Sequence, residues 1–437
     1  MVAAQLARRG IPAVLVEGGG RAGRGTAYST DEVAHLLNVR AEGMSAWADD
    51  PDDFARAFGA EGGDRKGFAQ RRLFGRYLRQ ILDYSTASGL IEVIEDRAVA
   101  AQPTGDGWRV ELENGDPIEA SALVLATGNE APDPLRLFDG SGERFINNPW
   151  GRDAAAAIAE LARTGGDALL VGTGLTMVDT VLSLAEAGHT GRIVALSRRG
   201  QMPRAHGDLT PAPVEQGEVP HGNVLALWRW LRRRSGQVGW RAAVDSLRPY
   251  SHALWQSFSP VQQRRFIRHA RPWWDVHRHR IAPEVAERLR GLIAEGRLQV
   301  MAGRIGEVRP VASGLKVEIG GRGSDTSVPH PATASLRVSP SPASREGLFA
   351  YAFNCTGPLG TISRTSNPML RGLLDDGLVK PDDIGMGLDV DADSRAGERL
   401  WALGPLTKGR FWEIVAVPDI RGQANGVADD IARELGR

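Results

Sequence analysis

The feature that most constrains the fold is a strand–turn–helix–strand pattern near the middle of the chain. An apolar run at 168–171 leads through a Gly-Thr-Gly turn into a helical stretch at 175–188, and a second apolar run follows at 192–197. A glycine turn in this context is typical of a dinucleotide-binding βαβ unit, whose helix start faces a pyrophosphate. Met177 replaces the third glycine, so the strict G-x-G-x-x-G fingerprint is not met. The candidate phosphate-binding residues are Gly172, Gly174, Leu175 and Thr176.

The end of the second strand of this unit indicates which nicotinamide cofactor is bound. NAD sites place an acid here to bind the ribose diol, whereas this chain has Ser197, Arg198 and Arg199. One hydroxyl and two cations suit the 2′-phosphate of NADPH. The alternative is a basic surface turn, because nearly all positive charge in this chain is arginine.

The N-terminus has the second half of a similar unit. Residues 2–10 predict an amphipathic helix that runs to about residues 7–9 and ends at a glycine, and residues 12–16 predict a parallel strand. Glu17 ends that strand and is followed by three glycines beginning with Gly18, so its carboxylate could accept hydrogen bonds from ribose hydroxyls. Alternatively, it is a solvated acid at a strand end.

A glycine-rich loop follows this strand. Gly25 would let the backbone approach a cofactor, and Arg24 could reach a pyrophosphate. The alternative is an ordinary flexible loop.

The chain repeats one plan twice: a βαβ unit, a meander and a strand that ends in Thr-Gly. We therefore predict an α/β fold with two Rossmann-like domains, each a three-layer parallel sheet plus a meander, and a helical insertion. The first domain would comprise residues 1–150 and, on the return of the chain, 346–437. The second would comprise 151–345, with the helical insertion at 221–295 and a polar Gly/Ser/Pro excursion at 321–347.

Composition excludes several classes of protein. Lys+Arg and Asp+Glu both number 53, so no net charge attracts nucleic acid or a membrane. No apolar run is long enough to span a bilayer. The lone Cys355 excludes an intramolecular disulfide framework and a multi-cysteine metal site, and we expect it to be a small buried residue. His277 and His279 lack further metal ligands nearby. We expect a bacterial cytoplasmic protein without a metal.

The insertion mixes arginine with tryptophan, a combination that can bind single-stranded nucleic acid. Because the chain has no net charge, we prefer a helical cap that shapes a pocket for a small-molecule substrate. We therefore expect neither nucleic acid nor a membrane as partner, and the chain could form a homo-oligomer.

Five segments carry a resemblance to a known family: 23–54, 71–78, 171–179, 353–358 and 400–424. Together they resemble the bacterial FAD/NAD(P)-binding protein family, two-dinucleotide flavoproteins related to class B flavin monooxygenases and N-hydroxylases. The resemblance implies an oxidoreductase that uses FAD and NADPH, in which a hydride passes to the flavin and then oxygen or another acceptor is reduced. No catalytic residue is identifiable. The alternative is a non-catalytic nucleotide-binding regulatory or scaffold protein.

The resemblance also suggests where the flavin is held. It places Asn38 and Met44 near the flavin ring, although a turn asparagine and a core methionine would fit the same pattern. Two Thr-Gly pairs end strands, where glycine permits close backbone approach to a nucleotide. The last element has Gly-Pro where many flavoproteins have Gly-Asp, whose acid bonds the ribitol. The residues concerned are Thr127, Gly128, Thr356, Gly357, Gly404, Pro405 and Ile420.

Such proteins begin with a strand and a G-x-G-x-x-G loop, which would precede Met1 here. From the resemblance we expect roughly 15 residues, one strand and a short turn, to be absent. Without that loop the FAD pyrophosphate would lose backbone amides and a helix dipole. We therefore expect this 437-residue form to be colourless, to aggregate readily and to bind FAD poorly, as an inactive truncated flavoprotein would.

Overall fold

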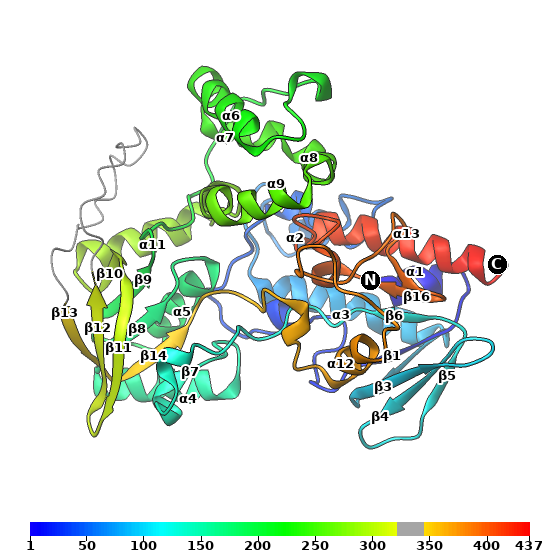
Figure 1. Cartoon of the computed structure of the whole chain (residues 1–437), viewed down its shortest axis with the longest axis horizontal. Helices are drawn as coiled ribbons and strands as arrows, with labels where there is room; N and C mark the ends of the chain where they lie inside the picture. Colours follow the sequence, from blue (N-terminus) through cyan, green and yellow to red (C-terminus); the bar gives the residue numbers. More distant parts are fainter. Residues whose placement is uncertain (321–344) are drawn as a thin grey trace. The chain divides into compact units, whose positions relative to one another are not determined.

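The computed structural model describes residues 1–320 and 345–437 and divides into two compact units (Figure 1). Unit 1 contains Met1–Glu130, Asp208–Trp274 and Thr361–Arg437, and unit 2 contains Ala131–Gly207 and Asp275–Gly360. This division differs from the predicted boundaries, because most of the helical insertion groups with unit 1. The predicted excursion at 321–347 lies outside the described residues, except that 345–347 begin a strand.

Unit 2 is built on one five-stranded, fully parallel sheet in the order β10-β9-β8-β14-β7, with an antiparallel meander β11-β12-β13 beside it. Its strands are β7 Phe145–Ile146, β8 Ala168–Val171, β9 Ile193–Ser197, β10 Leu298–Ala302, β11 Arg304–Val311, β12 Gly314–Gly320, β13 Arg345–Phe349 and β14 Tyr351–Asn354. Its helices are α4 Arg152–Thr164, α5 Leu175–Glu186 and α11 Pro283–Ala294.

The predicted βαβ unit is confirmed as β8, α5 and β9, with both strands parallel. Ala168, Leu169 and Leu170 are fully buried, as expected for a central strand covered on both faces. Two details of the prediction were wrong. β10 was expected in the meander but pairs in parallel with β9, and the apolar run 348–354 divides into β13 and β14, which join different sheets.

Unit 1 contains three small sheets: the parallel pair β1-β2, the sheet β15-β16-β6 and the antiparallel meander β3-β4-β5. Its strands are β1 Ala13–Val16, β2 Ile91–Ile94, β3 Ala98–Pro103, β4 Trp108–Leu112, β5 Ile118–Ala120, β6 Leu123–Leu125, β15 Arg395–Gly397 and β16 Leu400–Ala402. Its helices outside the insertion are α1 Val2–Arg8, α2 Asp53–Ala60, α3 Arg71–Ala87, α12 Pro368–Asp375 and α13 Val417–Glu434.

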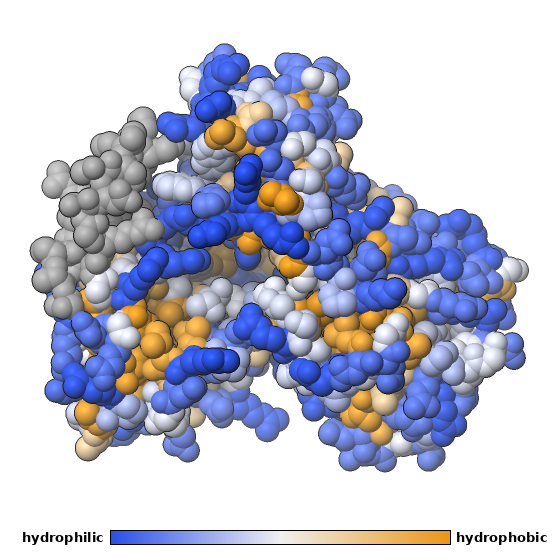
Figure 2. Space-filling model, in the orientation of Figure 1, coloured by the Kyte–Doolittle hydropathy of each residue, from blue (hydrophilic) through white to orange (hydrophobic). Residues whose placement is uncertain are grey.

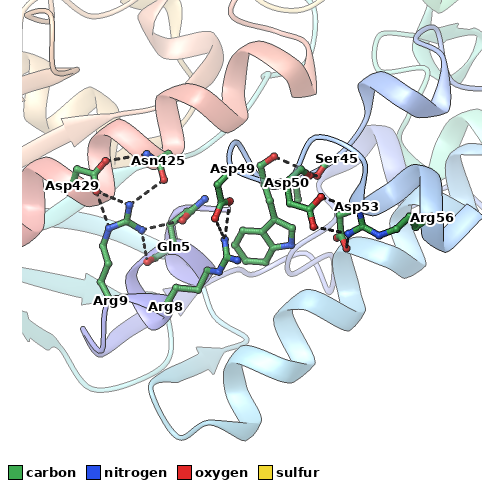
Figure 3. Close-up of polar contacts among 12 residues, drawn as sticks. Gln5, Arg8, Arg9, Ser45, Asp49, Asp50, Asp53, Arg56, Asn425 and Asp429 are labelled. Atoms are coloured by element: carbon green, nitrogen blue, oxygen red, sulfur yellow. Dashed lines mark hydrogen bonds and ion pairs between the residues drawn. The ribbon is translucent and has the colours of Figure 1, made fainter. Parts of the chain in front are cut away.

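The first elements agree with the prediction. The chain begins in α1, and β1 follows as a parallel strand, although its partner β2 was expected to belong to the meander. Arg9, just after α1, donates hydrogen bonds to Asp429 at 2.9 Å and to Asn425 at 3.0 Å, both on α13 (Figure 3). These contacts fix the first helix on the last one.

Two sheets of unit 1, β1-β2 and β15-β16-β6, share one apolar cluster although no strand of one pairs with a strand of the other. β6 and β16 pair in parallel, and so do β1 and β2, but within the described residues no strand links the two pairs. Ala13 of β1 nevertheless packs in the same cluster as Val124 of β6 and Trp401 of β16, together with residues of α1 and α13. Side chains of these two helices therefore join the sheets.

The predicted helical insertion is confirmed. It contains α6 Val224–Val238, α7 Trp240–Ser246, α8 Ser251–Ser257, α9 Pro260–Arg265 and α10 Arg271–Arg278. Asn223 caps α6 by accepting from the Ala226 N–H at 3.0 Å, and Gly239, with φ at 80°, separates α6 from α7. The visible surface of this segment, at the top of Figure 2, is largely hydrophilic. Among residues 1–320 and 345–437, no helix combines the length and the apolar character needed to cross a membrane.

Candidate functional site

The glycine turn after β8 has the geometry that a phosphate-binding turn requires. Gly172 has φ at 122°, and a Cβ there would lie 2.2 Å from the Cys355 carbonyl oxygen, so only glycine fits. A Cβ at Gly174, directly before α5, would meet nothing within 4 Å. Leu175 and Thr176 are the first residues of α5. The first N–H groups of an α-helix have no acceptor within the helix, so the start of α5 beside this turn could bind an anion.

The predicted Ser197 lies beside this turn at the end of β9. Its Oγ is 2.9 Å from Oγ1 of Thr173 and accepts a hydrogen bond from the Gly200 N–H at 3.0 Å. Thr173 also donates to the Gln201 carbonyl oxygen. Side-chain hydrogen bonds that sequence reasoning missed therefore lock the strand end against the glycine turn. Arg198 is exposed and Arg199 half-buried.

Thr356 and Gly357 lie in unit 2, directly after β14 and Cys355. Asn354, fully buried, accepts hydrogen bonds on Oδ1 from the Thr356 N–H at 3.3 Å and hydroxyl at 2.7 Å. Its Nδ2 donates to the Asp133 carbonyl oxygen at 2.9 Å and to Asn147 at 2.8 Å. Asn354 thereby fixes the end of β14. Sequence reasoning missed this residue, although a lone amide in an apolar run could have identified it.

Cys355 is a buried thiol. Burial raises its pKa to about 12, with Thr180 Oγ1 3.7 Å from the sulfur. A protonated thiol is a poor nucleophile, which agrees with the expectation of a structural cysteine.

Glu17, the predicted ribose ligand, turns back over its own glycine loop. Its Oε2 accepts a hydrogen bond from the Arg21 N–H at 2.6 Å, and a Cβ on Gly19 would lie 2.9 Å from Oε1. A Cβ on Gly18 would lie 3.1 Å from the Asp96 carbonyl oxygen. The Glu17 carboxylate thus holds the loop in shape. A ribose hydroxyl would have to bind a carboxylate that already accepts a hydrogen bond from Arg21.

Two predicted cofactor residues of unit 1 carry buried polar atoms without a partner among the described residues. Arg24 donates from Nη2 to the Gly20 carbonyl oxygen at 3.3 Å, but its Nε has no acceptor. Thr127 Oγ1 also has no partner. Buried polar groups in native proteins are nearly always hydrogen-bonded. A polar ligand would supply these partners, so both residues fit a cofactor. Gly25 and Gly128 have φ at 62° and 72°, and a Cβ on either would meet nothing within 4 Å.

Asn38 and Met44 occupy different environments. Met44 is 2% exposed and packs in a core cluster with Leu37, Phe54 and Val417, which is the environment of a core methionine. Asn38 is half-buried.

Gly404 is held against α13. Its φ is 63°, and its N–H donates to Gln423 Oε1 at 2.8 Å, so the protein already satisfies this amide. Gln423 in turn donates to Thr407 at 2.9 Å and to Ser394 at 3.0 Å. Pro405 follows in a 3₁₀ turn, and Ile420 lies in the first turn of α13, with its Cδ1 3.8 Å from where a Gly404 Cβ would be.

The predicted residues are divided between the two units. Unit 2 holds Gly172, Gly174, Leu175, Thr176, Ser197, Arg198, Arg199, Thr356 and Gly357. Unit 1 holds Glu17, Gly18, Arg24, Gly25, Asn38, Met44, Thr127, Gly128, Gly404, Pro405 and Ile420. In the described part of the chain, no group of three or more His, Cys, Asp or Glu could hold a metal ion.

A comparison with protein families finds that residues 1–130 match a family described as FAD-NAD(P)-binding. An uncharacterized protein of Mycobacterium tuberculosis is 27% identical over 150 residues. The match covers 33% of this chain and only 25% of the length of that curated relative.

Two solved structures are similar in fold over nearly the whole chain. Ornithine hydroxylase from Pseudomonas aeruginosa has 13% identity and a TM-score of 0.63. An ornithine N-hydroxylase from Kutzneria sp. 744, in a complex with reduced FAD, NADP+ and L-ornithine, has 15% identity and a TM-score of 0.60. Each comparison covers 99% of this chain and 96% of the other. The predicted fold class is therefore confirmed: residues 1–130 match an FAD-NAD(P)-binding family, and the chain shares its fold with these two ornithine hydroxylases.

Proposed function

We propose that this chain is an FAD-dependent, NADPH-using oxidoreductase of the monooxygenase type that acts on a small molecule. The observation that carries the proposal is the turn between β8 and α5, which lies beside the basic end of β9 in unit 2. The family match of residues 1–130 supports FAD in unit 1. The fold shared with N-hydroxylases supports the monooxygenase class.

The two units would divide the work. In unit 2, the amides at Gly174 and Leu175 would hold the NADPH pyrophosphate, and Arg198 and Arg199 would pair with its 2′-phosphate. In unit 1, Arg24 and Thr127 would hold FAD through the buried atoms described above. Bound FAD would supply the redox chemistry, taking a hydride from NADPH and passing electrons to oxygen or another acceptor. The protein's contribution is to bind, orient and keep out water.

A second candidate function is nucleotide binding without turnover, in a regulatory or scaffold protein. In unit 1, Glu17 already bonds the Arg21 amide and the Gly404 amide is already satisfied by Gln423. Fewer polar groups therefore remain for FAD in unit 1 than the resemblance implies. Unit 2 could still bind NADPH by itself.

The decisive experiment is to mix the purified chain, with FAD added in excess, with NADPH in the absence of oxygen. Loss of flavin absorbance that requires the protein would support the oxidoreductase. The control is Gly172→Val, which should abolish the reaction because its side chain would meet the Cys355 backbone. Binding of NADPH without any flavin reduction, even with FAD bound, would favour the non-catalytic function.

A further inference from the structure

The helical insertion of unit 1 contains an apolar cavity that the predicted cofactor sites do not use. The empty space inside it is about 520 Å³, a figure that includes open solvent, so the enclosed part is smaller. Helices α6, α8 and α10 and the segment before α13 line it. The lining residues are Val224, Leu227, Trp228, Leu231, Leu247, Ser251, Leu254, Trp255, Phe258, Phe266, Ala270, Trp274 and Trp412.

Tryptophan and phenylalanine rings form much of the wall of this cavity, and aliphatic side chains form most of the rest. Trp255 and Trp412 stack with ring centroids 4.6 Å apart and planes 24° apart, and Phe266 meets Trp412 edge-on at 5.2 Å. Among residues 1–320 and 345–437, no charged side chain lines the cavity. A zwitterionic amino acid would lose its hydration there without gaining a charged partner, whereas a planar apolar molecule would stack.

One of the indole N–H donors in the cavity wall has no acceptor among the described residues. Three tryptophans of the lining are at most 8% exposed. Trp255 donates from Nε1 to the Gly409 carbonyl oxygen at 2.7 Å, and Trp274 donates to the carboxylate of Glu413. Trp412 Nε1 is buried and has no acceptor among the described residues. Because buried indole N–H groups usually find a partner, an occupant with one acceptor atom would complete this set.

One wall residue of the cavity is close in sequence to the element expected to hold the flavin. Trp412 lies between the Gly404 turn and the start of α13 at Val417, and Gly409 and Glu413 belong to the same segment. One stretch of chain thus forms both a cavity wall and the predicted flavin-binding element of unit 1.

We propose that this cavity binds a neutral, planar, mostly apolar molecule that carries one hydrogen-bond acceptor, and that this is the class of the enzyme's substrate. The second half of the statement rests on the proposed function, and the first half does not. The ligand class differs from the free amino acid bound by the similar Kutzneria ornithine N-hydroxylase.

The test is calorimetric titration of the full chain with quinoline and with naphthalene. These probes have the same shape, but only quinoline carries an acceptor atom. We expect both to bind and L-ornithine not to bind. Trp412→Phe should weaken quinoline about fivefold to tenfold and change naphthalene affinity less than twofold, because it removes the N–H and keeps a ring. Ala270→Leu, which fills part of the cavity, should weaken both probes.

Absence of binding by both aromatic probes, or binding of L-ornithine with equal strength, would overturn the proposal. Equal weakening of both probes by Trp412→Phe would refute the role of the indole N–H. Failure of the oxidoreductase proposal gives a different result: quinoline would bind, but FAD with NADPH would show no flavin reduction. In that case the cavity remains a binding site and its occupant is not a substrate.

Discussion

In both units, predicted cofactor residues follow the ends of β-strands, but the two units build their sheets differently. In unit 2, β8 lies inside a continuous sheet between β9 and β14, and it leads directly through glycine into α5. In unit 1, the parallel strands form two separate pairs, β1-β2 and β6-β16. Within residues 1–130 and 361–437, no strand leads directly through a glycine turn into an α-helix.

This difference shows that a sequence pattern at strand ends does not by itself make a phosphate site. Glu17, Gly128 and Gly404 follow strands just as Gly172 and Gly357 do. Among the described residues, the Gly172 turn of unit 2 combines close packing against the residue after β14 with a position directly before an α-helix. We therefore expect unit 2 to be the stronger dinucleotide site in this chain.

The largest effect should come from Gly172→Val. The new Cβ would meet the Cys355 carbonyl oxygen at 2.2 Å, in a backbone conformation that valine avoids. We expect unit 2 to be destabilised by about 3 kcal/mol or more and NADPH binding to be lost. Thermal unfolding and NADPH titration would measure this. Gly174→Ala is the matched control, since its Cβ meets open space. Equal damage from both variants would show that the turn is not closely packed.

The next largest effect is the difference in affinity of the unaltered chain for NADPH and for FAD. A helix start that contributes two or three bonds to a pyrophosphate, each worth about 1.5–3 kcal/mol, changes affinity by several orders of magnitude. We therefore expect NADPH to bind far more tightly than FAD, and the purified protein to be colourless. Titration of each cofactor, with the flavin absorbance of the pure protein, decides this. Stoichiometric FAD in the purified chain would mean that unit 1 offers another set of donors.

Sequence reasoning predicted the elements better than their pairing. The periodicity of α1 and α5 and the apolar runs of β1 and β8 are local properties, and all four elements form as expected. Pairing depends on residues far apart in the chain. For this reason β2 and β10 were placed in meanders although each has a parallel partner.

The candidate site shows the same limit. The turn at Gly172 was identified because its signal is local, whereas the bonds of Thr173, Asn354 and Gln423 depend on tertiary contacts. Nothing in the sequence could show that Gln423 of α13 would accept a hydrogen bond from the Gly404 N–H.

The cofactor preference of unit 2 gives a smaller effect. Replacing Arg198 and Arg199 together by alanine should weaken NADPH at least about tenfold and leave NADH nearly unchanged, because only NADPH carries the 2′-phosphate. Fluorescence titration with both cofactors would measure this. Equal loss for NADH and NADPH would refute the 2′-phosphate assignment and favour a basic surface turn.

The smallest effect concerns the polar contacts that hold α13 on the sheet β15-β16-β6 of unit 1. Asp430 of α13 is 3% exposed and accepts hydrogen bonds from Trp401 of β16 at 2.9 Å and from Arg395 of β15. Burial acts to raise the pKa of Asp430, but the bonds from Arg395 and Trp401 outweigh it and lower the pKa overall. Folding is therefore stabilised by the ionised form. That contribution is complete above the unfolded pKa of about 3.9 and is lost as the pH falls through the lower folded pKa.

Asp430→Asn should accordingly cost about 1.5 kcal/mol of unfolding free energy at pH 7, and less as the pH falls below about 4. The neighbouring Asp429→Asn is the control, because it removes the exposed ion pair with Arg9 and affects one further hydrogen bond, from Asn425, and it should cost at most about 1 kcal/mol. Urea unfolding across this pH range would measure both. Since the contacts lie in unit 1, NADPH binding in unit 2 should change less than twofold. A loss of NADPH affinity that parallels the loss of stability would mean that the two units unfold as one and do not bind nucleotides independently.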